Sequence, residues 1–292
     1  MKKARLRARR SNTMSLQSDL PRGVARDVSV RVKALAGLIL LLGLAACGPG
    51  DAPPWKAEAV KAVPDAEAGY LAPPLALAAQ PARDGSVVLS GSAAPNAAVR
   101  LGTPSGEVLN AVADAKGAWT ATARLSDTVK LYGLSMSVEG RTVQSEGYLA
   151  LTPDGGAAQL RAGAGARVIS PPSRRPRILA IDYDRDGGAV VSGVGTPSAD
   201  VGLRVNRVAR GDSNVDAQGR FAIALTQPLA QGPHEFEVAA EGGEDRVVAA
   251  TARPVPPSGA PFQASRGGEG WQIDWMTPGG GVQTTLLFDR RG

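Results

Sequence analysis

Few residues in this 292-residue chain have side chains that commonly perform catalysis or bind metals. The chain has one histidine, His234, and one cysteine, Cys47. A zinc site needs several Cys or His ligands, and a nucleophilic triad needs a His with partners. His234 follows Gly232-Pro233, where we expect a solvent-facing loop residue. We therefore expect no catalytic residues and no cofactor, and we interpret the protein as a non-enzyme.

An acidic run is the one candidate for a metal site. Asp182, Asp184 and Asp186 alternate along the chain and are followed by Gly187, a pattern that also opens an EF-hand calcium loop. The twelfth position of such a loop should be Glu, but here it is Gly193. The favoured interpretation is an ordinary acidic turn, and a weak calcium site is the alternative.

Two of the four tryptophans lie near the C-terminus. Trp271, Ile273 and Trp275 alternate, a Gly-rich turn follows at 277–281, and residues 282–288 can run back as a second strand. An isolated hairpin is marginally stable in water, so this one must pack on something. The favoured interpretation is a strand pair that covers the edge or face of a sandwich. The alternative is an exposed aromatic platform, formed by Trp271 and Trp275, that binds a glycan or a partner chain.

The positive charge of the chain lies at its N-terminal end. Ten of the 33 Lys and Arg residues and two of the 27 acidic residues lie in residues 1–33, and the other 23 and 25 leave a net charge of −2. A basic stretch followed by a short apolar run is typical of a secretory signal, and residues 34–46 are too few to span a bilayer. We therefore expect a signal peptide at 1–46, with Met14 as an alternative start, and no nucleic-acid partner.

The end of this apolar run resembles the lipobox of bacterial lipoproteins. Leu44-Ala45-Ala46 leads directly into Cys47. The resemblance implies that the chain is cut before Cys47, that this cysteine carries the lipid, and that the lipid anchors the protein to a membrane. Several acyl chains on one cysteine give stable anchoring. Gly48 in place of Asp implies sorting to the outer membrane of the bacterial cell envelope, with the periplasmic or surface face left open.

An internal repeat follows the N-terminal region. With an offset of 102 and no gap, 12 of the 38 positions 84–121 are identical to positions 186–223. Trp119 is matched by Phe221, and Glu139-Gly140 recurs as Glu241-Gly242. A repeat this regular indicates a duplicated module. Apolar residues within it alternate with polar ones between turn signals, which predicts short strands with one buried face.

The repeated pattern resembles bacterial Ig-like domains. It is carried by Val88-x-Ser90-Gly91 through Asp114-x-x-Gly117-x-Trp119 and by its second copy. The fold class that this implies is all-β, with two tandem Ig-like β-sandwich domains after a cleaved signal peptide and with a C-terminal β-hairpin. The expected organisation is a signal peptide at 1–46, a Pro/Ala-rich tether at 47–74, Ig-like domains at 75–153 and 177–255, a linker at 154–176 and a hairpin tail at 256–292. Within the linker, residues 158–161 and 167–169 could add an edge strand to the first module.

This fold hosts many functions, so the resemblance says little about the role. The leading hypothesis is a non-catalytic envelope lipoprotein whose modules serve as a spacer or a protein-interaction scaffold. The alternative is a surface module that binds glycan or peptidoglycan through the Trp-rich hairpin. The expected partners are the membrane, through Cys47, and an envelope protein or a glycan.

Overall fold

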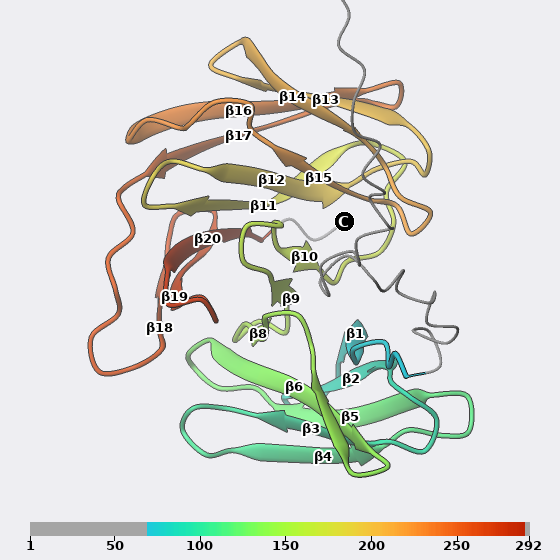
Figure 1. The fold of residues 1–292 in the computed structure, drawn as a ribbon. Coiled ribbons are helices and arrows are strands. Elements are labelled where there is room, and N and C mark those ends of the chain that lie inside the picture. Colours follow the sequence, from blue (N-terminus) through green and yellow to red (C-terminus); the bar gives the residue numbers. More distant parts are fainter. Residues whose placement is uncertain (1–68, 290–292) are drawn as a thin grey trace, which may run out of the picture. The chain divides into compact units, whose positions relative to one another are not determined.

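The computed structural model describes residues 69–289, and these residues are all-β (Figure 1). Twenty strands and no helix are found in this part of the chain, so no helix there can cross a membrane. All of the described residues belong to one compact unit. The expected signal peptide, the lipobox-like sequence with Cys47 and nearly all of the expected tether lie outside the described residues.

The first module is a two-layered sandwich. Its three-stranded sheet has the order β1-β2-β5, and the facing sheet contains β4-β3-β6-β7. The strands are β1 (Leu75–Pro81), β2 (Ser86–Ser92), β3 (Ala98–Gly102), β4 (Val108–Val112), β5 (Ala118–Arg124), β6 (Lys130–Val138) and β7 (Arg141–Gln144). This is the order A-B-E and C′-C-F-G of an immunoglobulin-like sandwich.

The second module repeats this topology. Its sheets have the orders β11-β12-β15 and β14-β13-β16-β17. The strands are β11 (Arg177–Asp184), β12 (Ala189–Val194), β13 (Asp200–Val205), β14 (Val208–Asn214), β15 (Arg220–Ala224), β16 (Gly232–Ala240) and β17 (Gly243–Thr251). Both ends of β16 lie 102 residues after those of β6. The sequence repeat is therefore a repeat of structure, and the prediction of two Ig-like sandwiches is confirmed.

Alternation places the core residues as the sequence predicts. Along β5 every second residue is buried, and the indole of Trp119 lies in the first core. Phe221 occupies the equivalent place in the second core. Both rings lie over a glycine of the neighbouring strand, since Gly91 pairs with Trp119 and Gly193 pairs with Phe221.

These two glycines explain the repeated Ser-Gly motif. A Cβ on Gly91 would lie 1.9 Å from the Leu75 carbonyl oxygen and 2.5 Å from the Trp119 ring. A Cβ on Gly193 would lie 1.9 Å from the Arg177 oxygen and 2.5 Å from Phe221. The first strand of each module bends over this position with a bulge, at Ala76/Ala78 and at Ile178/Ala180. Only glycine leaves room for both the bulge and the ring.

The segment expected to be a linker contains strands. After β8 (Tyr148–Leu151), β9 (Ala157–Leu160) and β10 (Arg167–Val168) extend the sheet of the first module in the order β6-β8-β9-β10. All four residues of β9 are buried. Residues 154–176 are therefore not simply a spacer, because their small apolar side chains pack between sheets.

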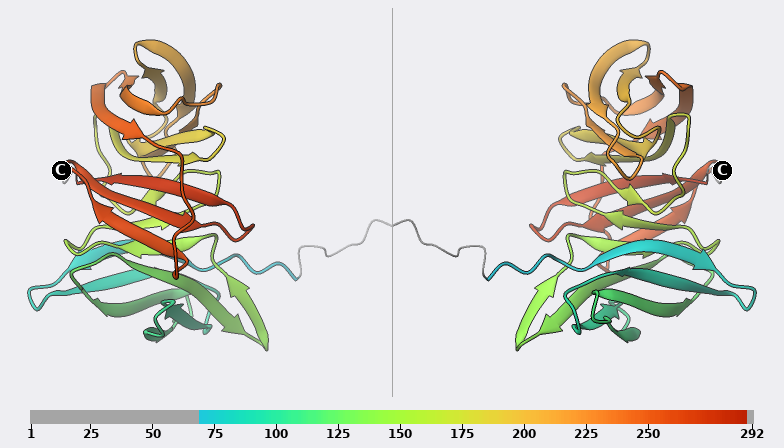
Figure 2. Two further views of the ribbon diagram at one scale, coloured as in Figure 1. Left: turned by 90° about the vertical axis from the view of Figure 1, so that its left-hand side faces the viewer. Right: turned by 90° about the vertical axis from the view of Figure 1, so that its right-hand side faces the viewer.

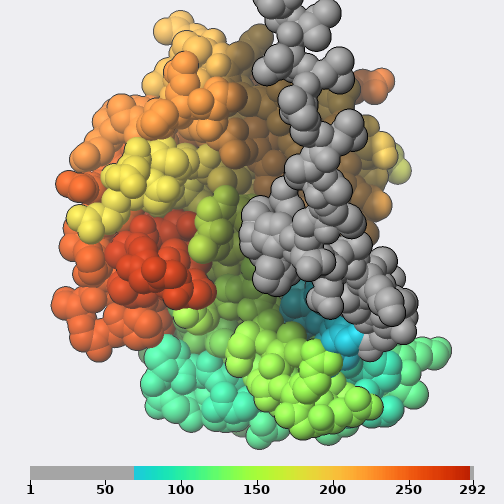
Figure 3. All heavy atoms as spheres, viewed as in Figure 1, coloured from blue at the N-terminus to red at the C-terminus, as the bar shows by residue number. Residues whose placement is uncertain are grey.

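The C-terminal segment extends the second module. The predicted hairpin is confirmed as β19 (Gly270–Met276) with β20 (Val282–Phe288), and β18 (Phe262–Arg266) adds a third strand. Strand β20 pairs antiparallel with β11, so the hairpin continues the sheet from its A-strand edge. Figure 1 shows β20 beside β11, and in the turned views the red C-terminal strands lie next to the yellow strands of the second module (Figure 2). In Figure 3 the red spheres of these strands lie against the yellow ones.

A third hydrophobic core lies between the two sandwich cores. It combines side chains of β8 and β9 with the outward faces of β11, β19 and β20. Its buried members include Leu131 and Leu160 from the first part of the chain, and Ala180, Ile273 and Trp275 from the second. The two modules therefore share buried surface in this structure, rather than being joined by exposed chain alone.

Candidate functional site

The acidic run does not form a metal site. Asp184 Oδ1 accepts the backbone N–H groups of Asp186 at 2.9 Å and Gly188 at 2.8 Å, so it closes a turn. Asp182 lies instead in the buried layer beside the third core. No three His, Cys, Asp or Glu side chains in residues 69–289 are grouped to hold a metal ion. These contacts fit the ordinary turn and give no support to a calcium site at Asp182, Asp184 and Asp186.

Asp182 accepts hydrogen bonds from three directions. The Thr285 hydroxyl donates to Oδ1 at 2.5 Å, Gln283 Nε2 donates to Oδ1 at 3.1 Å, and the Ala166 N–H donates to Oδ2 at 2.6 Å. Burial nevertheless dominates and raises the pKa of Asp182 to about 6. Its donors come from β20 and from the segment before β10, so this carboxyl group holds both to β11.

Trp275 is part of the core and not of an exposed platform. Its side chain is fully buried, its Nε1 donates to Thr285 Oγ1 at 3.0 Å, and its ring makes an edge contact with Tyr148 at a centroid distance of 5.8 Å. Alternation along β19 places Ile273 on the same face. Trp275 therefore packs as the favoured interpretation has it, and the alternative of an exposed ring is corrected for this residue, because the third core covers it.

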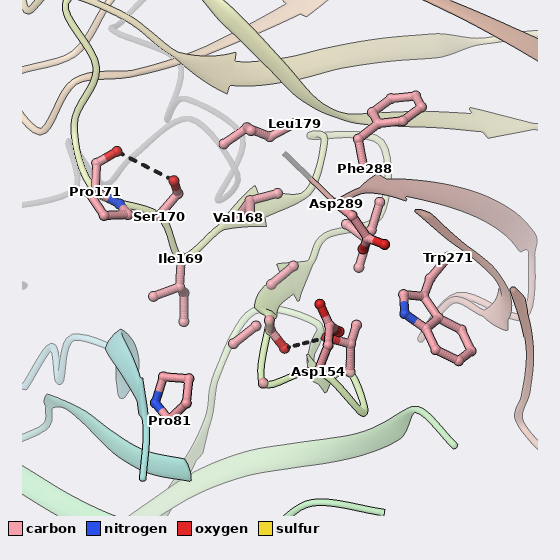
Figure 4. Close-up of a pocket in the computed structure, with 16 residues that line it drawn as sticks. Pro81, Asp154, Val168, Ile169, Ser170, Pro171, Leu179, Trp271, Phe288 and Asp289 are labelled. Atoms are coloured by element: carbon pink, nitrogen blue, oxygen red, sulfur yellow. Dashed lines mark hydrogen bonds between the residues drawn. The ribbon is translucent and has the colours of Figure 1, made fainter. Parts of the chain in front are cut away.

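Trp271 lies at the end of the same strand but lines a cleft. This cleft has a volume of about 290 Å³ and is formed by the β8–β9 turn, residues 168–171 and the end of β20 (Figure 4). The Arg266 guanidinium lies 5.3 Å from the centroid of the Trp271 ring and forms an ion pair with Asp289. The cation–π contact and the ion pair fix the half-buried indole ring at one wall of the cleft.

The Trp271 indole has an unused hydrogen-bond donor. Its Nε1 is buried and has no partner among the described residues. Figure 4 shows this nitrogen turned toward the side of the cleft where Asp154 and Asp289 lie. Thr152 Oγ1 donates to Asp154 Oδ1 at 2.5 Å across the β8–β9 turn, which holds that carboxylate in place. The cleft therefore offers one aromatic donor beside two carboxylates.

His234 is buried, which corrects the expectation of a solvent-facing loop residue. It lies in β16, its Nε2 is 2.7 Å from the Ala230 carbonyl oxygen, and its Nδ1 is 3.1 Å from Asn206 Nδ2. Since a carbonyl can only accept, Nε2 carries the hydrogen and Nδ1 accepts from the amide. Both ring nitrogens form hydrogen bonds within the fold, so His234 has no free nitrogen for a reaction.

Comparisons with known proteins give neither a family nor a curated relative. No family model matches the chain, and no curated protein matches it. Among solved structures, the chain is similar to the BSP domain of a biofilm-associated protein, with 16% identity over 62% of this chain and 30% of that one, at a TM-score of 0.21. It thus spans less than a third of that structure's length.

Two further solved structures are similar to a comparable extent. The central fibronectin-III array of RIM-binding protein has 13% identity over 74% of this chain and 88% of that one, at a TM-score of 0.25. Invasin, a bacterial integrin-binding protein, has 13% identity over 76% of this chain and 55% of that one, at a TM-score of 0.19. The assignment of the fold as all-β and Ig-like rests on the strand order described above.

Proposed function

We propose that this protein is a non-catalytic lipoprotein of the bacterial cell envelope, whose two Ig-like modules act as a spacer or a protein-interaction scaffold. The sequence supports anchoring, since the basic stretch, the apolar run and Leu44-Ala45-Ala46-Cys47 stand in the order of a lipoprotein signal. Among the described residues, the buried and doubly bonded His234 and the lack of a metal-binding group support a role without catalysis.

The main support for a scaffold role is the third core, which both modules share. A spacer on a membrane must hold its far end at a defined place, and a flexible linker between modules would lose that definition. Here residues 157–168 contribute strands and buried side chains in place of free chain. Sharing a core makes the pair act as one body, which suits a scaffold that presents its loops and edges to a partner.

Labelling and fractionation test the anchor. In bacteria expressing the full chain, a fatty-acid probe should label the wild type and not the Cys47→Ala variant, and the variant should leave the membrane fraction. The uncut precursor is recognised by its larger mass, so a chain whose signal is still attached is told apart from one held by the lipid. Unchanged labelling of Cys47→Ala would contradict the lipid anchor.

Pull-down experiments test the scaffold against the second candidate, glycan binding. The unpartnered indole N–H of Trp271 in a cleft of about 290 Å³ is the observation that favours a sugar ligand, whose hydroxyls accept hydrogen bonds. The scaffold predicts capture of envelope proteins and no binding to purified peptidoglycan sacculi. Binding to bare sacculi that is lost in Trp271→Ala, with the thermal midpoint unchanged, would instead favour the glycan-binding module.

A further inference from the structure

A second cleft, which adjoins the Trp271 cleft at Val168, contains three arginines. It has a volume of about 280 Å³, and its lining includes Arg161, Arg167, Asn214, Asp216 and Arg220. Two of these arginines come from the segment between the modules, while Arg220 begins β15 of the second sandwich. The three arginines and Asp216 together carry a formal charge of +2.

The guanidinium groups of Arg161 and Arg220 are held by hydrogen bonds and an ion pair within the protein. Arg161 donates from Nε to the Gly165 oxygen at 3.0 Å and from Nη2 to the Ala164 oxygen at 2.9 Å. Arg220 forms an ion pair with Asp216 at 3.2 Å. Glu146 is 3.8 Å from Arg161, but its side chain is 59% exposed, so water and salt screen it.

Arg167 hydrogen-bonds only to neutral acceptors among the described residues. Its Nη2 donates to the Gln159 side-chain oxygen and, at 3.4 Å, to the Ala76 carbonyl oxygen. Burial, followed by the positive charges of Arg220 and Arg161, lowers the pKa of Arg167 below its ordinary value. Asp216, the carboxylate that lines the cleft, is paired with Arg220. A half-buried guanidinium beside two others is therefore costly unless a further anion enters the cleft.

We propose that Arg161, Arg167 and Arg220 bind a phosphoryl group in this cleft. Planar guanidinium forks match the oxygens of phosphate, and a phosphate monoester carries a charge of about −1.5 to −2 at pH 7, close to that needed here. A carboxylate offers only about half of this charge. The cleft is also large enough for an esterified phosphate, so the ligand is either free phosphate or the phosphate of a larger molecule.

The internal repeat supplies a natural comparison for this cleft. At the offset of 102, Arg220 corresponds to Ala118 and Asn214 to Val112, and both of these residues are exposed. Arg161 and Arg167 lie in the segment between the copies and have no counterpart. The first module keeps the same turn, with Asp114 in place of Asp216, and the same Gly–aromatic pair without an arginine at position 118, so the fold itself does not require Arg220.

Calorimetric titration of the full chain with inorganic phosphate, at low ionic strength and pH 7.5, tests the proposal. We expect saturable binding of phosphate, binding at least tenfold weaker for acetate, and at least a tenfold loss of phosphate affinity in Arg167→Gln and in Arg220→Ala. The latter restores the residue found in the first module, so the fold should tolerate it. Arg124→Ala removes an exposed positive charge from the first module and should bind like the wild type.

Several results would overturn the proposal. They are no heat with 10 mM phosphate, acetate binding as tightly as phosphate, or equal losses in Arg124→Ala and Arg220→Ala. Arg167→Lys keeps the charge and removes the fork, so it should also lose affinity while the thermal midpoint is retained. Glycerol 3-phosphate in place of inorganic phosphate distinguishes the source, because tighter binding of the ester indicates a phosphate carried by a larger molecule, and equal or weaker binding indicates free phosphate.

Discussion

In the first module the last sandwich strand is split into β7 and β8, whereas in the second module β17 continues unbroken beside the whole of β16. The break lies at Gly147, which has a φ of +71° and whose Cβ would lie 1.8 Å from the Leu160 oxygen. After the break, β8 pairs with β6 on one side and with β9 on the other. The first module therefore uses the end of its last strand to build the joint between the modules, that is, the third core with strands β8 and β9. The second module keeps its last strand within the sandwich.

The first strands of the two modules, β1 and β11, also differ, and here it is the second module that gains a neighbouring strand. In the second module β11 is covered by β20, while β1 pairs with β2 and with no other strand of the described residues. Position 182 on β11 is a buried Asp bonded to β20, and its counterpart Gln80 on β1 is exposed. The two copies therefore share the same sandwich cores and differ at their edges, where the third core and the clefts are formed.

The largest effect should come from removing the centre of the joint. Trp275→Ala deletes a fully buried ring of the third core and leaves the Thr285 hydroxyl without its donor, which should cost about 3–5 kcal/mol. Urea unfolding followed by circular dichroism measures this loss. Trp271→Ala is the matched control on the same strand, and a comparable loss in both variants would contradict the distinction between core and cleft.

The Ser-Gly motif should be equally important in both copies. Gly91→Ala and Gly193→Ala each place a Cβ against a backbone oxygen and an aromatic ring, and each should cost about 3 kcal/mol of unfolding free energy. Thermal denaturation of the two variants compares the modules directly. Gly202→Ala is the control, because a Cβ at this position would contact no heavy atom within 4 Å. A mild loss of stability at only one of the two motif positions would contradict the structural equivalence of the two modules.

The buried carboxyl group should make the second module sensitive to pH. Because burial raises the pKa of Asp182 to about 6 in the folded state, the folded protein binds this proton more tightly than the unfolded chain, whose pKa is about 3.9. This contribution to stability is complete below about pH 4 and is lost as the pH rises through about 6, by about 3 kcal/mol in all.

Thermal midpoints between pH 4.5 and pH 7.5 test this dependence. The wild-type midpoint should fall with rising pH, and that slope should be reduced in Asp182→Asn, which cannot ionise. The exposed counterpart provides the comparison, since Gln80→Glu should leave the slope as it is. A wild-type midpoint that does not change over this range would contradict the assigned titration.

The smallest effect concerns the turn shared by both copies. Asp114 Oδ1 accepts the N–H groups of Lys116 and Ala118, and Asp216 Oδ1 accepts those of Gln218 and Arg220. Replacing either Asp by Ala should cost about 1 kcal/mol, because two backbone donors lose their acceptor. Chemical denaturation checks this value, and Asn at either position should retain most of the stability, since its side-chain oxygen also accepts.

The sequence predicted what depends on local pattern. Alternation placed Trp119 and Phe221 in their cores, and the constant offset of 102 predicted two copies of one sandwich. The C-terminal hairpin followed from Trp271, Ile273 and Trp275 around a Gly-rich turn. These features could be predicted because strand period and turn chemistry act over a few residues.

Features that depend on distant contacts were not predicted. The Gly-rich segment 154–176 has the composition of a linker, but Ala158 and Leu160 pack in the third core. His234 was expected in solvent because its local sequence contains no sign of Asn206, 28 residues away. The arginine cleft brings together residues 161, 167 and 220, and no spacing pattern in the sequence predicts that these residues lie close to one another.

The pairing of β20 with β11 also constrains the order in which the protein folds. Strand β20 is the last described strand in chain order, yet it covers an edge formed about 100 residues earlier. During synthesis or export from the N-terminal end, that edge stays open until the C-terminal strands emerge, and an open strand edge invites pairing with other chains. Truncation before β18 should therefore yield aggregation rather than a shorter soluble scaffold.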